Sequence, residues 1–92
     1  MVLTGDQSYS CSGSIAANYI KLYGNTISTK DLANTDYMFY NYQNERIPFE
    51  INYRLTISSR ANDMFNNANK LTQLPVMNNL KVHSLSNFCY WC

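Results

Sequence analysis

The sequence predicts an α+β domain, in which N-terminal helices are followed by a small antiparallel sheet and a further helix. Three observations support this prediction. Apolar residues recur at helical spacing near the N-terminus, they alternate with polar residues over 47–57, and helical spacing returns over 60–73. Helical spacing is typical of amphipathic helices, and alternation is typical of half-buried strands. The resulting order, in which helices and strands are segregated, indicates the α+β class.

The first predicted helix covers residues 12–23 and carries five apolar positions at helical spacing: Ile15, Ala16, Tyr19, Ile20 and Tyr23. A serine at its start can cap it, and Gly24 suits the left-handed position that follows a helix. Ser28 and Asp31 have the form of a capping box, which predicts a short second helix through Leu32.

The strongest strand signal is the alternation of six apolar residues with polar ones: Ile47, Phe49, Ile51, Tyr53, Leu55 and Ile57. A period of two predicts one buried face. We expect this to be the longest strand, paired antiparallel with residues 37–42 through a turn near Asn44. Pro48 lies near its start, where an edge tolerates the missing amide donor.

The last third of the chain is predicted to contain one helix and one strand. Residues 60–73 show helical spacing, Pro75 ends the pattern, and residues 76–85 have strand character. Residues 88–92 then form an aromatic, cysteine-containing tail. No internal repeat or linker is predicted, so residues 1–92 are expected to form a single domain.

Composition excludes several classes of function. Net charge is +1 and the seven basic residues are scattered, so we expect no nucleic-acid partner. The N-terminus does not resemble a signal peptide, and no apolar run is long enough to span a membrane. Three cysteines argue against a complete disulfide framework, so a cytoplasmic location is the default expectation.

Cys11 stands just before the first predicted helix, where the helix dipole and free amides would stabilise a thiolate. A nucleophilic cysteine needs such a position, because the thiolate is the attacking species. The alternative is that Cys11 is a small apolar residue packed against the core.

The segment around Cys11 resembles papain-like cysteine peptidases, nearest to the bacteriocin-processing peptidase domains of peptide-exporting ABC transporters. The resemblance rests on Cys11, the helix ending in Tyr23-Gly24, and Ile27-Ser28 followed by Leu32. It covers the N-terminal quarter of the chain, which would then be only the first half of a papain-like fold.

The resemblance implies that Cys11 is the nucleophile and that Gln7 donates to the oxyanion. His83 is the only imidazole and would be the base, with Asn87 as the group that orients it. As alternatives, His83 is a surface or edge residue, or a second half of the fold supplies the true histidine.

Cys89 and Cys92 form a Cys-x-x-Cys pattern, which in other proteins binds zinc or acts as a redox pair. Zinc would need Cys11 and His83 as further ligands. A tail that covers the core is favoured, with a disulfide from Cys11 to either cysteine as the next option. No metal or cofactor is therefore predicted.

Two functions follow. The first is a papain-like thiol hydrolase of peptide or amide bonds, or a catalytically incomplete relative. The second is a small non-enzymatic interaction or structural protein, such as a phage, viral or accessory subunit, that docks on a larger partner. Both imply a peptide or protein partner, and the second is compatible with homo- or hetero-oligomers.

Overall fold

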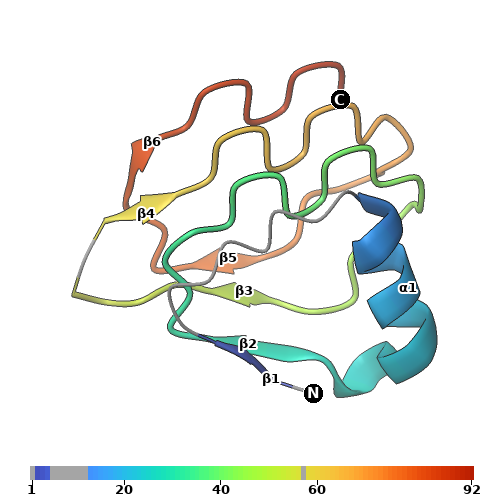
Figure 1. Cartoon of the computed structure of the whole chain (residues 1–92), viewed down its shortest axis with the longest axis horizontal. Coiled ribbons are helices and arrows are strands. Elements are labelled where there is room, and N and C mark those ends of the chain that lie inside the picture. The colour runs from blue at the N-terminus through green and yellow to red at the C-terminus, as the bar shows by residue number, and fades with distance from the viewer. Residues whose placement is uncertain (1, 5–12, 57) are drawn as a thin grey trace.

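The computed structural model describes residues 2–4, 13–56 and 58–92. Its backbone follows a similar path several times, so that segments 26 or 24 residues apart lie side by side and form hydrogen bonds (Figure 1). We name the successive turns coil 1 (residues 28–50), coil 2 (51–76) and coil 3 (77–92). In such a solenoid, each coil contacts mainly its neighbours.

Short parallel strands join the coils. Within the described residues there are three two-stranded parallel sheets. They pair β1 (Val2–Thr4) with β2 (Ser28–Lys30), β3 (Ile51–Asn52) with β5 (Met77–Asn78), and β4 (Ser59–Arg60) with β6 (Val82–Ser84). The predicted α+β fold with an antiparallel sheet is therefore wrong. Parallel pairing results because the same part of each coil returns in the same direction.

A run of tight turns follows the strands in each coil, and we name these turn runs 35–42, 61–68 and 85–92. Within the first, Met38, Tyr40 and Tyr42 donate their amides to the carbonyls three residues earlier, at 3.0–3.2 Å. Alternate amides instead donate to coil 2, as Phe39 does to the Met64 carbonyl at 2.9 Å. The predicted strand over 37–42 and helix over 60–73 are both wrong.

The apolar spacing over 60–73 is compatible both with the predicted helix and with the observed run of tight turns. Ala61, Met64, Phe65 and Ala68 are all buried, as one face of a helix would be. Consecutive three-residue turns, however, also bring these positions to the same side. The difference lies in the amides, because Phe65 donates to the Phe88 carbonyl of coil 3 at 2.9 Å rather than to a residue within its own segment.

The turn runs repeat in sequence as well as in structure, so the expectation of no internal repeat is wrong. Met38-Phe39-x-Asn41 recurs as Met64-Phe65-x-Asn67, 26 residues later. Positive φ recurs at equivalent positions of all three runs: Tyr37, Asp63 and Asn87, then Asn41, Asn67 and Trp91. Asn and Asp tolerate this left-handed region better than most residues, which explains their frequency at these positions.

The core is a column of side chains along the stacking direction. Phe39 and Phe65 are stacked with ring centroids 5.6 Å apart, and Phe88 meets Phe65 edge-on at 5.1 Å. Phe39 and Phe65 are fully buried, together with Leu32, Ile51, Tyr42 and Tyr53 at 0–2% exposure. Offset-stacked and edge-to-face pairs are the favoured arrangements of aromatic rings.

A buried polar network links coil 1 to coil 2. The Thr35 hydroxyl donates to the Arg60 carbonyl at 3.0 Å and shares a hydrogen bond of 2.7 Å with the Tyr53 hydroxyl. Burial raises the pKa of Tyr53 to about 12. Asp36 pairs with Arg60 at 2.9 Å and also accepts the Asn62 amide at 2.8 Å, so its carboxylate fixes the register of the two coils.

A helix lies beside the coils. This helix, α1 (Gly13–Tyr23), agrees with the helix predicted over 12–23, and it continues into the 3₁₀ helix η1 (Gly24–Thr26). Gly24 has the expected positive φ of 54°. The predicted second helix is wrong because Ser28 begins β2. The long strand predicted over 47–57 is also wrong, since β3 is limited to two residues within it.

The coils differ in length at one corner. Leu32 bridges to Tyr53 and Asn34 bridges to Arg60. Only Ala33 therefore lies between the two bridges in coil 1, whereas residues 54–59 lie between them in coil 2. Leu55, in this longer corner, is 65% exposed.

Candidate functional site: a proline-lined groove

The hydrogen-bonded ladder between residues 45–51 and residues 72–76 is interrupted at one place. Thr72 donates to the Glu45 carbonyl at 3.1 Å, and the next hydrogen bond along this ladder, among the described residues, joins the Ile51 amide to the Val76 carbonyl at 2.9 Å. Pro48 and Pro75 lie between these two bonds and have no amide hydrogen to donate. The two segments therefore separate and leave a groove.

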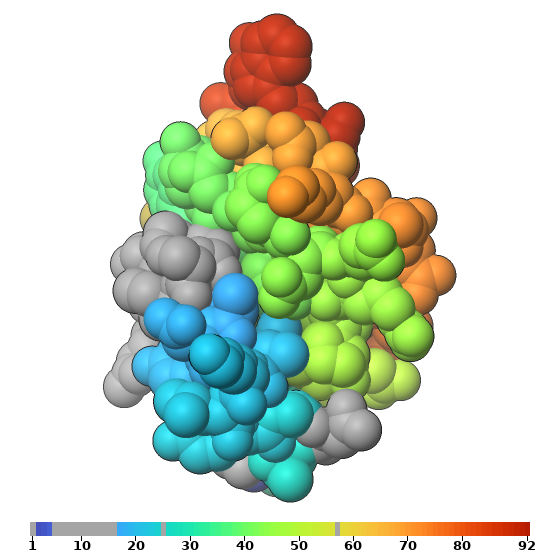
Figure 2. Space-filling view, turned by 90° about the vertical axis from the view of Figure 1, so that its right-hand side faces the viewer, coloured from blue at the N-terminus to red at the C-terminus, as the bar shows by residue number. Residues whose placement is uncertain are grey.

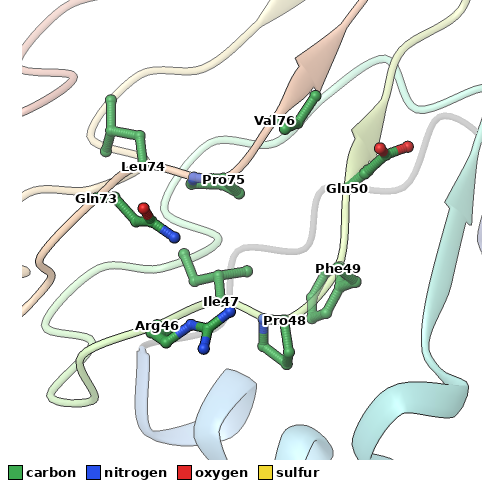
Figure 3. Close-up of a pocket in the computed structure, with 9 residues that line it drawn as sticks. All are labelled: Arg46, Ile47, Pro48, Phe49, Glu50, Gln73, Leu74, Pro75 and Val76. Atoms are coloured by element: carbon green, nitrogen blue, oxygen red, sulfur yellow. The ribbon is translucent and has the colours of Figure 1, made fainter.

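Six of the nine residues that line this groove are apolar. The groove has a volume of about 520 Å³, which is within the range of roughly 300–1,000 Å³ that is usual for ligand sites. Figure 3 shows residues 47–49 on one wall and 74–76 on the other. Leu74 is 46% exposed and Val76 is 57% exposed, so their apolar side chains remain in contact with water.

Two opposite charges flank the apolar walls. Arg46 lies with Gln73 at one end of the groove, and Glu50 lies beside Val76 at the other (Figure 3). The Glu50 carboxylate accepts a hydrogen bond from the Asn78 side-chain amide at 3.1 Å. Neither Arg46 nor Glu50 forms an ion pair with another residue of the described ranges. Both charges are therefore available to a ligand.

The structure describes two of the four predicted catalytic residues, His83 and Asn87. Gln7 and Cys11 lie outside the described residues. His83 is exposed at the middle of β6, and Asn87 is exposed in the third turn run with a φ of 54°. No hydrogen bond joins His83 to Asn87 in the part of the chain that the structure describes. The assignment of these four residues to a thiol hydrolase stays a prediction.

The tail is part of coil 3, and its two cysteines are joined to each other. Cys89 and Cys92 form a disulfide with Cα atoms 5.2 Å apart, rather than a link from either residue to Cys11. They occupy the positions that Phe65 and Ala68 occupy in coil 2. The Cys92 sulfur lies 3.4 Å from the Phe65 carbonyl oxygen, so the disulfide contacts the backbone of coil 2.

Sequence reasoning missed the groove because each of its walls resembles an ordinary loop. The available signal was the recurrence of Ile47-Pro48 as Leu74-Pro75 one coil later. When the two segments are aligned, the two prolines predict a site where neighbouring coils lack backbone hydrogen bonds.

Among the described residues, no helix has the length and apolar character needed to cross a membrane. Nor do three or more potential metal ligands gather anywhere in those residues. Comparisons with protein-family models, with curated proteins and with solved structures found no match.

Proposed function

We propose that this protein is a non-catalytic binding module, and that its groove holds an extended segment of a partner polypeptide. The observation that carries the proposal is the interruption of the ladder between residues 46–50 and 73–76. Apolar side chains remain exposed there, although the same coils bury Phe39, Tyr42 and Phe65 elsewhere. Exposed apolar surface with a polar rim is typical of protein-binding sites.

An extended polypeptide suits this groove because backbone amides along it have no hydrogen-bond partner among the described residues. The amides of Ile47, Phe49 and Leu74 donate to no backbone carbonyl of the described residues. A peptide that lies along an interrupted ladder supplies the missing partners for such groups and places alternate side chains in the groove.

The flanking charges specify the sequence of the segment. Arg46 favours an acidic residue at its end of the groove, and Glu50 favours a basic residue at the other end. The segment should therefore carry an acidic residue, an apolar centre and a basic residue in one fixed order. Charge complementarity of this kind contributes mainly to specificity.

The test is a selection from a random dodecapeptide display library on the wild-type protein, with affinities measured on synthetic peptides. Replacing Leu74→Asp should weaken binding by about tenfold or more, since it places a charge in the apolar centre. Leu85→Asp is the matched control, because Leu85 is 45% exposed, close to the 46% of Leu74, and lies outside the groove. This control should bind normally.

The charge order gives a second, independent outcome. The double variant Arg46→Glu with Glu50→Arg should select peptides with the reversed order of charges. The proposal is refuted if no peptide is enriched, or if the enriched peptides bind Leu74→Asp as tightly as they bind the wild type.

A further inference from the structure

A second hollow lies on the turn runs and is separate from the groove. It has a volume of about 540 Å³ and is lined by Tyr40, Asn66, Asn67, Tyr90 and Trp91. Tyr40, Asn66 and Tyr90 occupy equivalent positions in coils 1, 2 and 3, because Asn34 bridges to Arg60 and Arg60 pairs with Ser84. Adjacent coils are about 4.8 Å apart. The short Asn66 between two long tyrosines therefore leaves the space open.

Trp91 is unfavourable for folding in two respects. Its φ is 62°, in the left-handed region, where the equivalent residues of coils 1 and 2 are Asn41 and Asn67. A bulky residue in this region is strained, and such strain is often found at functional sites. The side chain is also 68% exposed and meets the Tyr90 ring edge-on at 5.0 Å. Figure 2 shows the C-terminal end of the chain, in red, projecting beyond the neighbouring coils.

The hollow combines aromatic faces with free hydrogen-bonding groups. Asn66 uses its side-chain nitrogen to donate to Asp63 at 2.8 Å, and Asn67 uses its own to donate to Asn41 at 2.6 Å. The side-chain oxygens of both asparagines accept no hydrogen bond from a described residue. Two acceptors on residues that line the hollow are therefore left for a ligand beside Tyr90 and Trp91.

We infer that this hollow binds a neutral saccharide. A sugar ring has a C–H face that packs against aromatic rings and hydroxyl groups that donate to the oxygens of Asn66 and Asn67. No Lys or Arg lines the hollow, so an anionic ligand such as a phosphate would lose its counterions without a protein cation to replace them. An aromatic side chain of a partner without donors would leave both oxygens buried and unpaired, which is unfavourable.

This site goes beyond the proposed peptide groove, and it can be tested separately because Trp91 is the only tryptophan of the chain. Its fluorescence would be titrated with maltohexaose, cellohexaose, mannohexaose and chitohexaose. We expect at least one to give a saturable blue shift and to protect Trp91 from acrylamide quenching, at concentrations up to about 10 mM, a range that detects dissociation constants near 1 mM. Leu74→Asp should leave this response unchanged.

Substitutions in the hollow then distinguish an effect on sugar affinity from an effect on the stability of the fold. Trp91→Asn introduces the residue found in the other coils, so thermal stability should be equal or higher, while calorimetry should show affinity reduced about tenfold or more. Asn66→Leu keeps the shape, removes one acceptor and should have a similar effect on affinity. Tyr23→Asn is the control, because Tyr23 is 44% exposed on α1, outside the hollow.

Three outcomes would overturn the inference. The first is that none of the four oligosaccharides changes the emission of Trp91. The second is that Trp91→Asn and Asn66→Leu bind the active sugar as well as the wild type does. The third is that N-acetyltyrosinamide gives the saturable shift and the sugars do not, which would assign the hollow to an aromatic side chain of a partner protein.

Discussion

Replacing Phe65→Ala should destabilise the protein more than most substitutions, because Phe65 lies at the centre of the aromatic column. The ring is fully buried, with Phe39 stacked on one side at 5.6 Å and Phe88 edge-on at 5.1 Å. Removal of a buried phenylalanine costs about 3–5 kcal/mol. A loss near 4 kcal/mol would lower the melting temperature of a domain of this size by about 16–32 °C.

The stacked architecture predicts which of these residues are coupled. Phe39 and Phe65 are in contact, so a double-mutant cycle with leucine substitutions should give a coupling energy of about 0.5–1.5 kcal/mol. Phe39 and Phe88 are two coils apart and share only Phe65 as a partner, so their coupling energy should be smaller than that of Phe39 with Phe65. Leucine is used because it keeps the double variants folded.

Urea denaturation followed by circular dichroism would measure these free energies. Leu55→Ala serves as the control, since Leu55 is 65% exposed and should change stability by less than about 0.5 kcal/mol. The reasoning fails if Phe65→Ala costs less than about 1 kcal/mol, or if Phe39 couples to Phe88 as strongly as to Phe65.

Three further predictions concern other parts of the chain. Between about pH 10 and 12 the wild type should lose up to about 1.4 kcal/mol of stability per pH unit, because Tyr53 ionises near pH 10 when unfolded but has a folded pKa of about 12. In urea titrations at several pH values, Tyr53→Phe should remove this part of the dependence of stability on pH. Asn62→Ala should cost about 1–3 kcal/mol in the same assay, because the Asn62 oxygen accepts both the Ser86 amide and the Ser84 hydroxyl at 2.8 Å, whereas Ser84→Ala should cost less. If Cys11 is a nucleophile, it should react with iodoacetamide at about pH 6, well below the ordinary thiol pKa near 8.5; a rate typical of an unactivated thiol would contradict the hydrolase hypothesis.

Local signals in the sequence were sufficient for α1 and for part of the core. The helix carries its own stop signal at Gly24, and its apolar positions need no distant partner to be recognised. The burial of Ile51 and Tyr53 agrees with the alternating pattern around them. Within the turn runs, by contrast, the spacing of Ala61 and Phe65 did not show where their amides would bond.

Parallel stacking could not be predicted from any single segment, because it depends on contacts between residues about one coil apart. The relevant evidence was the recurrence of Met-Phe-x-Asn, which becomes informative only when two distant segments are aligned. The same limit applies to both candidate binding sites. The groove needs two prolines from different coils, and the saccharide site needs Tyr40 and Tyr90 on either side of Asn66.

The unequal corner between the coils shows where this protein can accept additional residues. Ala33 in coil 1 and residues 54–59 in coil 2 connect the same two bridges, so the stack already accommodates very different connection lengths there. Doubling the length of a flexible loop costs only about 0.6 kcal/mol. A peptide tag or a small domain could therefore be inserted beside Leu55 without changing the register of the coils. An insertion within 61–68 would instead shift the turn run that carries the aromatic column.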